Sequence, residues 1–172
     1  MKKEILKPRK TGEERKKKYK VSIQKRIKKY IKDGSKGNLD LYKNPVEKLP
    51  DNLKVGGYLD LIRTPIKELP DNLQVDGSLY LKNTPIEKLP GNLKVGDSLD
   101  LDKTPIERLP DNLQVGGYLS LMNTPIERLS DNLQVGGDLL LMGTPLSKKY
   151  SKEKIRSMIE ERGGYVKGII IL

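Results

Sequence analysis

Leu49-Pro50-Asp51-Asn52-Leu53 begins a unit of 20 residues, and the same opening returns at Leu69, Leu89, Leu109 and Leu129. Gly91 replaces the aspartate in one copy, and Ser130 replaces the proline in another. The complete unit reads L-P-D-N-L-x-V-x-G-x-L-x-L-x-x-T-P-I-x-x. Because the spacing never drifts, we expect every unit to follow the same path and to stack on its neighbours.

Within each unit, small and aliphatic residues alternate with other residues over positions 53–61. This period of two is typical of a strand with one face turned inward. Thr64-Pro65 should then bend the chain, because proline disfavours a helical residue before it and donates no hydrogen bond. The segment Leu49–Asn52 has the composition of a turn, with proline at its first corner and Asp and Asn after it.

Each unit directs one set of aliphatic side chains inward, namely Leu49, Leu53, Val55, Leu59, Leu61 and Ile66 or their equivalents. A single unit cannot bury them, but units stacked at a strand spacing of about 4.8 Å can. The sequence therefore predicts a β-rich repeat solenoid with a parallel sheet and a continuous aliphatic core. Such a core is sufficient despite an apolar content of 35%.

Variants of the V-x-G-x-L-x-L segment also occur at both ends of the chain, with Ser35 in the Val place and Ile170 in a Leu place. Together with the repeats, in one of which Asp97 replaces the glycine, they predict about seven rungs: 35–41, 55–61, 75–81, 95–101, 115–121, 135–141 and 166–172. A helical stripe precedes the first rung and consists of Tyr19, Ile23, Ile27, Tyr30 and Ile31. Thr11 with Glu14 is a capping-box signature, and Gly34 ends this segment.

A shorter stripe of Ile155, Met158 and Ile159 precedes the last rung, between Ser151 and Gly163-Gly164. We expect helical caps at both ends, because a solenoid needs its open ends covered. The predicted organisation is a disordered basic arm (1–12), a basic amphipathic cap helix and turn (13–37), the solenoid (38–146), and a C-terminal cap helix with a final strand (147–172).

The repeated core Leu59-x-Leu61-x-x-Thr64-x-Ile66 resembles leucine-rich repeats, with Thr in the usual Asn place except at Asn44. The leucine that those repeats carry three residues before the L-x-L pair is replaced by Gly56, Asp76, Gly96, Gly116 and Gly136. A horseshoe and a plain β-solenoid cross-section both remain open. The 20-residue unit with its Leu-Pro opening is similar to repeats of bacterial effectors and of uncharacterised bacteriophage and bacterial proteins. The resemblance covers about 38–146 and implies binding, without the effectors' cysteine-dependent ligase activity.

The composition argues against catalysis, because the chain has neither Cys nor His. Thiol chemistry, imidazole general bases, and thiolate or imidazole metal ligands are thereby excluded. Asp40, Asp60 and Asp100 share one outward column, but Tyr80 and Ser120 interrupt it, so we expect no metal and no cofactor. No apolar run approaches the length of a membrane span, so we expect a cytoplasmic protein, in the host cytoplasm if a phage encodes it.

The net charge of +11 is concentrated at the N-terminus, where residues 1–37 hold 16 basic and 4 acidic residues. Residues 38–146 hold 11 basic and 16 acidic residues. Ten basic residues of the predicted N-terminal helix mostly avoid its apolar stripe: Arg15, Lys16, Lys17, Lys18, Lys20, Lys25, Arg26, Lys28, Lys29 and Lys32. They could contact DNA or RNA phosphates or an acidic protein. Alternatively, their charge only prevents end-to-end stacking.

The outward side of the main strand is richer in apolar and aromatic residues than a solvated face requires: Tyr42, Tyr58, Ile62, Tyr80, Tyr118, Met122, Leu140 and Met142. Tyr and Met favour partner surfaces. We therefore expect a non-catalytic binding protein whose solenoid face holds a protein partner, such as a phage-encoded inhibitor or adaptor of a host protein. The alternatives are binding of nucleic acid through the basic helix, and a virion structural role in which the edge 169–172 pairs with a neighbour. Tyrosine on strands also has a purely structural explanation, as a good strand former.

Overall fold

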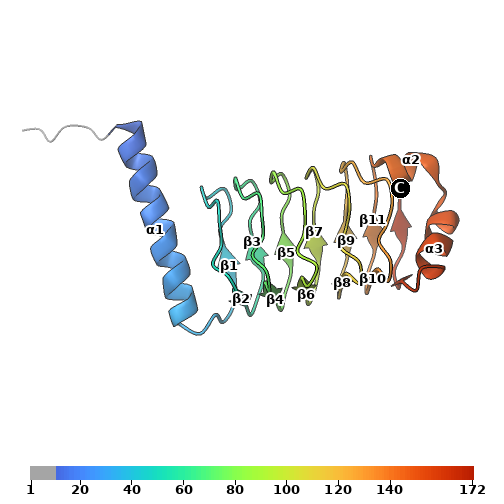
Figure 1. Ribbon diagram of the computed structural model, residues 1–172, viewed down its shortest axis with the longest axis horizontal. Coiled ribbons are helices and arrows are strands. Elements are labelled where there is room, and N and C mark those ends of the chain that lie inside the picture. Colours follow the sequence, from blue (N-terminus) through green and yellow to red (C-terminus); the bar gives the residue numbers. More distant parts are fainter. Residues whose placement is uncertain (1–10) are drawn as a thin grey trace, which may run out of the picture.

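The computed structural model describes residues 11–172, apart from the side chains of residues 15–19. It shows a parallel β-solenoid with helices at both ends (Figure 1), which confirms the predicted fold class. Residues 1–10, which make up most of the predicted basic arm, lie outside the described residues. The stacking follows the sequence repeat, because strands 20 residues apart pair in register.

The larger sheet, called here the main sheet, contains one strand from every rung: β1 (Leu39–Asp40), β3 (Leu59–Asp60), β5 (Leu79–Tyr80), β7 (Leu99–Asp100), β9 (Leu119–Ser120), β11 (Leu139–Leu140) and β13 (Ile170–Ile171). Five successive pairings with a step of 20 residues join β1 to β11. The final step, from Leu139 to Ile170, is longer because the C-terminal helices are inserted there. The solenoid therefore has about five complete turns, and the predicted count of seven describes only the strands of this sheet.

A second sheet of six parallel strands lies on another side of the coil: β2 (Lys54–Val55), β4 (Gln74–Val75), β6 (Lys94–Val95), β8 (Gln114–Val115), β10 (Gln134–Val135) and β12 (Tyr165–Val166). The single strand expected over 53–61 is thus two short strands with a corner at Gly56-Gly57. Glycine occupies most of these corner positions, although Asp76 and Asp97 stand there in single coils. A Cβ on Gly116 would lie 2.0 Å from the carbonyl oxygen of Gly96.

The two other corners use left-handed backbone conformations in most coils, with Asn92 as an exception. Asn52 has φ of 56°, which confirms the turn expected after Pro50. The bend predicted at Thr64-Pro65 begins earlier, at Arg63, whose φ is also 56°. Thr64 is buried instead, and its hydroxyl donates to the carbonyl oxygen of Leu61 at 2.8 Å. Threonine therefore recurs because it satisfies a backbone acceptor inside the corner.

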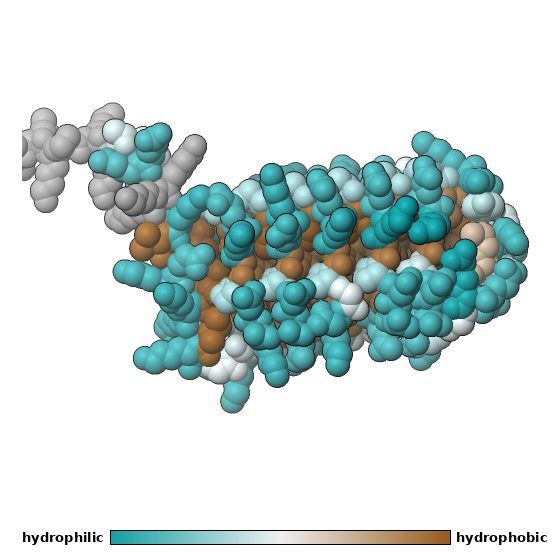
Figure 2. All heavy atoms as spheres, viewed as in Figure 1, coloured by the Kyte–Doolittle hydropathy of each residue, from teal (hydrophilic) through white to brown (hydrophobic). Residues whose placement is uncertain are grey.

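The core is a single apolar cluster that runs from Ile23 to Ile170 through every coil. Leu59, Leu61 and Ile66 are fully buried, as are their equivalents in the following units. The leucine that opens each unit, such as Leu89, lies at the border of the core and keeps a few per cent of its surface exposed. Figure 2 shows the result on one face, where rows of hydrophilic side chains border apolar residues along the stack.

The N-terminal cap is one helix, α1 (Gly12–Lys32), which begins with the predicted capping box of Thr11 and Glu14. Ile23 and Ile27 are buried against the first coil, whereas Ile31, which the sequence placed in the same stripe, is exposed. The Tyr30 hydroxyl donates to the carbonyl oxygen of Ser35 at 2.8 Å, which fixes the end of the helix to the first coil. Figure 1 shows α1 tilting away from the coils towards its N-terminal end.

The C-terminal cap consists of α2 (Pro145–Lys149) and α3 (Lys152–Glu160), followed by β12 and β13. The sequence predicted α3 with its N-cap Ser151, but not α2, because Thr144-Pro145 looked like another bend. Thr144 caps α2 by accepting from the backbone N–H of Ser147 at 3.0 Å. The edge 169–172 contains β13, an end strand of the main sheet, and is partly exposed: Ile169 is exposed, Ile170 is buried, and Ile171 and Leu172 are half-buried.

Candidate binding surfaces

The outer face of the main sheet carries all eight side chains that the sequence assigned to a protein-binding surface. In-register pairing places them in columns that alternate with the buried leucines. Tyr42, Tyr118 and Met142 are 41%, 37% and 43% exposed, respectively. The other five are only half-buried: Tyr58, Ile62, Tyr80, Met122 and Leu140. The face is therefore accessible, with its most exposed apolar groups spread along the stack.

The tyrosines in the middle of this face form a group. The rings of Tyr58 and Tyr80 are 6.1 Å apart between centroids and tilted by 56°, an arrangement in the favourable range for aromatic pairs. Burial raises the pKa of Tyr118, and the neighbouring Tyr80 and Asp100 raise it further. Tyr118 therefore lies near Tyr80 and acidic groups, and it stays protonated at neutral pH.

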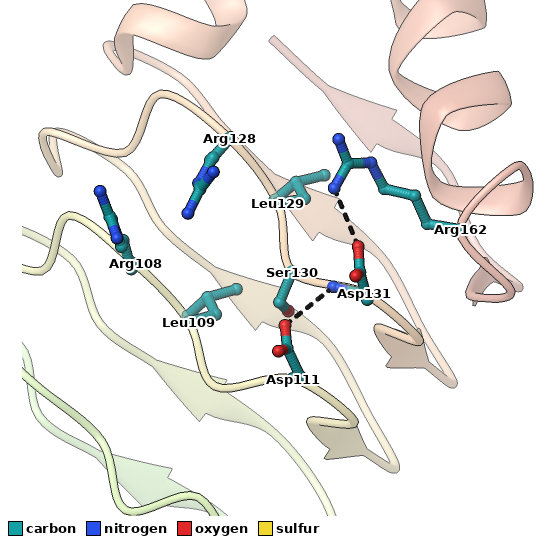
Figure 3. A pocket seen from close by; sticks show the side chains of 8 residues that line it. All are labelled: Arg108, Leu109, Asp111, Arg128, Leu129, Ser130, Asp131 and Arg162. Carbon is teal, nitrogen blue, oxygen red and sulfur yellow. Dashed lines mark hydrogen bonds and ion pairs between the residues drawn. The ribbon is translucent and has the colours of Figure 1, made fainter.

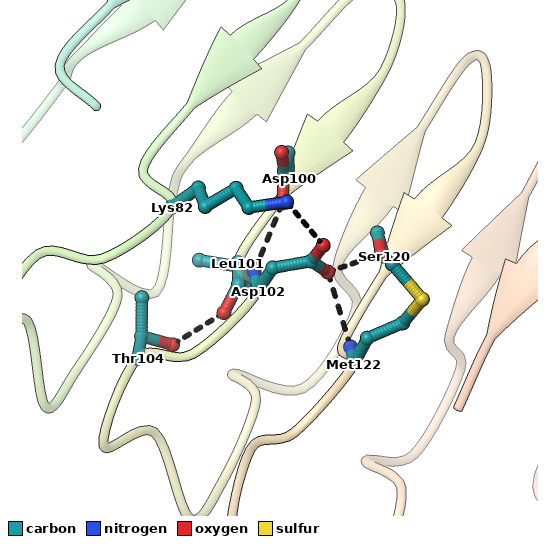
Figure 4. A network of polar contacts seen from close by, with 7 residues as sticks. All are labelled: Lys82, Asp100, Leu101, Asp102, Thr104, Ser120 and Met122. Atoms are coloured by element: carbon teal, nitrogen blue, oxygen red, sulfur yellow. Dashed lines mark hydrogen bonds and ion pairs between the residues drawn. The ribbon is translucent and has the colours of Figure 1, made fainter. Parts of the chain in front are cut away.

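Asp102 is at an outward position of the repeat, equivalent to Tyr42 and Met122, but it is not exposed. It is almost completely buried at the centre of a polar network (Figure 4). Its carboxylate accepts from Lys82 Nζ at 3.2 Å, from the Met122 backbone N–H at 3.2 Å, and from the Ser120 hydroxyl. Three partners compensate the burial of the charge. The network joins three adjacent coils and holds this part of the face in one arrangement.

Asp40, Asp60 and Asp100 have a structural role that sequence reasoning missed. Each accepts the backbone N–H of the residue two positions later at 2.9 Å. This local contact satisfies the backbone where the main strand ends and the next turn begins. Their common column follows from this turn geometry and needs no bound cation.

The residues directly before the main strands form a column on the outer face, and their side chains link consecutive coils. Asn38 accepts the Tyr58 N–H at 3.0 Å, Ser98 accepts the Tyr118 N–H at 3.2 Å, and Asp138 accepts the Ile169 N–H at 2.9 Å. A small polar residue stands 20 positions before each of the two tyrosines, and this sequence pattern could have predicted the contacts. The two tyrosines of this column are thereby fixed at their backbones.

Helix α1 forms the second candidate surface, with Lys20, Lys25, Arg26, Lys28, Lys29 and Lys32 all exposed as expected. Lys20 pairs with Glu47 of the first coil at 2.6 Å, and Lys29 pairs with Asp33. The side chains of Arg15, Lys16, Lys17 and Lys18 lie outside the described residues. Of the described basic side chains of α1, four have no carboxylate partner: Lys25, Arg26, Lys28 and Lys32.

A cleft of about 520 Å³ separates α1 from the first coil. Val21 and Ile23 line it on the helix side and Val46 on the solenoid side, with Lys25 and Lys28 at its border. It results from the tilt of α1, because only Ile23 and Ile27 are fully enclosed by the coil. The basic surface therefore lies beside a partly apolar cleft.

Comparison with known proteins does not assign the chain: no family model, no curated protein and no solved structure matches it. The described residues contain no group of three or more His, Cys, Asp or Glu side chains that could hold a metal ion. Among the described helices, none combines the length and hydropathy needed to cross a lipid bilayer. Function must therefore be argued from the two surfaces.

Proposed function

We propose that this protein is a non-catalytic binding protein that holds a protein partner on the outer face of its main sheet. The observation that carries the proposal is the exposure of Tyr42, Tyr118 and Met142 on a regular, rigid sheet. Inward positions repeat almost unchanged, whereas outward ones differ between coils. Such variation gives each coil its own contacts. A preformed surface also loses little conformational entropy on binding.

The likeness of the 20-residue unit to leucine-rich repeats supports the same function, since such solenoids present extended surfaces to protein partners. We propose an inhibitor or adaptor of a host protein, encoded by a phage and acting in the host cytoplasm. The similarity in repeat texture to bacteriophage proteins supports this narrower form.

The test is capture of a partner from a lysate of the native host by the wild-type chain and by a Tyr58→Ala/Tyr118→Ala variant. The double variant should lose the partner while its circular dichroism spectrum stays unchanged. Tyr165→Ala is the matched control, because Tyr165 is similarly exposed but belongs to the second sheet. Equal capture by all three proteins would show that this face is not the binding site.

Binding of nucleic acid through α1 is a second candidate, supported by its four exposed basic groups without a carboxylate partner. Contacts to phosphate would tolerate any sequence and weaken steeply with salt. Mixed-sequence DNA and RNA should be titrated at two salt concentrations. The test variant removes four charges from α1 (K25Q/R26Q/K28Q/K32Q), and the control removes four from the other end (K148Q/K149Q/K152Q/K154Q). Absence of binding at low salt, or equal loss in both variants, would contradict this candidate.

A further inference from the structure

A hollow of about 150 Å³ lies between the last two complete units and the C-terminal cap (Figure 3). It is on neither of the surfaces described above, because its walls come from the L-P segments that connect the two sheets. Three arginines line it: Arg108, Arg128 and Arg162. The remaining lining consists of two leucines, two aspartates and a serine: Leu109, Leu129, Asp111, Asp131 and Ser130.

The charges around the hollow are unequally engaged. Arg162 pairs with Asp131 at 2.8 Å, and the Asp131 backbone N–H donates to Asp111 at 3.1 Å. Arg108 and Arg128 form no hydrogen bond or ion pair with any described residue. Figure 3 shows their guanidinium groups next to each other, on the same side of the hollow. The site thus keeps two positive groups that no protein carboxylate neutralises.

The position of these arginines is specific to this end of the stack. The equivalent residues of the earlier units are Lys48, Glu68 and Lys88. Arg108 and Arg128 occupy the same position in consecutive coils, and their guanidinium groups lie side by side (Figure 3). Guanidinium groups arranged in this way can both donate to one oxyanion, and arginine favours bidentate contacts to phosphate.

Ser130 provides an independent observation. It replaces the proline that opens the four other units, and the absence of that ring leaves space in the hollow. Its hydroxyl oxygen is the one buried side-chain polar atom without a hydrogen-bond partner among the described residues. Buried polar atoms in folded proteins nearly always have a partner, so an unsatisfied hydroxyl at a cavity lined by free arginines indicates a bound polar group.

We propose that this hollow is a binding site for a phosphoryl group, either inorganic phosphate or the terminal phosphate of a monoester. Arg108 and Arg128 would donate to its oxygens, and the Ser130 hydroxyl would donate a further hydrogen bond. Leu109 and Leu129 offer an apolar wall to the carbon side of an ester. Asp111 and Asp131 disfavour a longer polyanionic chain, which restricts the ligand to one phosphoryl group.

The test is a titration of the full chain with inorganic phosphate, monitored by the NMR chemical shifts of the backbone amides. Chloride keeps the ionic strength constant. Saturable shifts should be confined to the three segments that line the hollow, around residues 108–111, 128–131 and 162. Arg108→Gln/Arg128→Gln should weaken binding by about tenfold per arginine. The control Lys48→Gln/Lys67→Gln removes the same amount of charge from earlier coils, away from the hollow, and should bind as the wild type does.

Two further variants separate a built site from general attraction of anions. Ser130→Pro restores the residue of the other units and fills the space, so it should abolish binding while the circular dichroism spectrum is retained. Asp111→Asn removes a repelling charge but keeps an acceptor for the Asp131 N–H, so it should strengthen binding. Shifts that never saturate, or equal losses in the arginine and lysine variants, would overturn the proposal.

A second titration with N-acetyl-O-phosphoserine amide identifies the source of the phosphoryl group. Tighter binding of this monoester than of inorganic phosphate would support a phosphorylated side chain of a partner as the ligand. Tighter binding of inorganic phosphate would support the free ion. Failure of both compounds to bind would overturn the site without affecting the proposed function of the main sheet, which involves other residues.

Discussion

The two ends of the solenoid are closed in different ways. At the C-terminus, Leu146, Ile155 and Ile159 are buried, and the chain then returns to add one strand to each sheet. At the N-terminus, α1 buries Ile23 and Ile27 but leaves Val21 and Ile31 exposed. The C-terminal cap is therefore part of both sheets, whereas the N-terminal cap is a helix packed against the first coil.

The difference also concerns the backbone groups at the last strands. Arg156 of α3 donates to the carbonyl oxygens of Val166 at 2.6 Å and Gly168 at 2.8 Å. These carbonyls would otherwise be free to pair with another chain. The C-terminal cap thus protects the end of the stack, while α1 keeps exposed cations and an open cleft beside it. The C-terminal end is therefore the better protected one, and the N-terminal end has more surface available for contacts.

The largest expected effects come from cutting the apolar contact of each cap. Ile155→Ala should lower the free energy of unfolding by about 2–5 kcal/mol, because α3 cannot detach without removing β12 and β13. Ile27→Ala should instead release α1 while the sheets remain folded, since α1 is attached at one side only. Urea unfolding followed by far-ultraviolet circular dichroism would show one cooperative transition for Ile155→Ala and an early loss of helix for Ile27→Ala. A single shared transition in Ile27→Ala would contradict the distinction.

A smaller effect is expected from Arg156→Met, which removes both hydrogen bonds to the terminal carbonyls but keeps much of the apolar stem. Hydrogen bonds to a charged group contribute about 1.5–3 kcal/mol, so stability should fall by that amount and self-association should rise. Urea unfolding and light scattering after size exclusion would measure the two changes. Arg162→Gln is the control, because its ion pair is exposed and should contribute at most about 1 kcal/mol.

The coils between the caps contain partly buried carboxyl groups that make the stability of the protein depend on pH. Burial raises the pKa of Asp60 and of Asp100. The folded state then binds a proton more tightly than the unfolded state, so this contribution to stability is present at low pH and is lost as pH rises through the raised pKa values. Asp60→Asn keeps an acceptor for Ile62 and removes the charge. Its stability relative to the wild type should therefore increase from acidic to neutral pH, as measured by urea unfolding at several pH values. An unchanged difference would contradict the assignment.

The smallest effect concerns the ion pair between α1 and the first coil. The hydrogen bond from Lys20 lowers the pKa of Glu47. Its contribution is present above the usual carboxyl pKa and is lost as pH falls through the lowered value. Lys20→Gln should return the pKa of Glu47 to the ordinary range in an NMR titration of its carboxyl carbon. A pKa that stays low in this variant would show that Lys20 does not hold the carboxylate.

The repeat predicted most of the fold because the inward leucines and the constant spacing leave one way to bury the core. It did not reveal the division into two sheets, since the alternation through Gly57 continues across the corner. In the structure the bend lies where glycines such as Gly96 and Gly116 approach the backbone of the preceding coil. The sequence also concealed α2, whose Thr144-Pro145 start has the same composition as a bend between coils.

The candidate surfaces were predicted in outline, because alternation separates outward from inward side chains. Their polar details were not. Asp102 is buried although its position points outward, since Lys82, Ser120 and Met122 from neighbouring coils enclose it. The hollow at Ser130 depends on arginines from two coils and on the C-terminal cap. The repeat spacing shows which backbone segments stack, but the polar contacts between coils depend on the particular side chain that each coil carries.

Hydrogen exchange of the intact chain, read at each amide, tests the contrast between the two ends most directly. The amides of β12 and β13 should be protected nearly as well as those of β7, because α3 and Arg156 secure the last coil. The amides of α1 should exchange much faster than any strand. If α1 is protected to the level of β7, or if β12 and β13 exchange as frayed ends do, the stack is not closed in the way described.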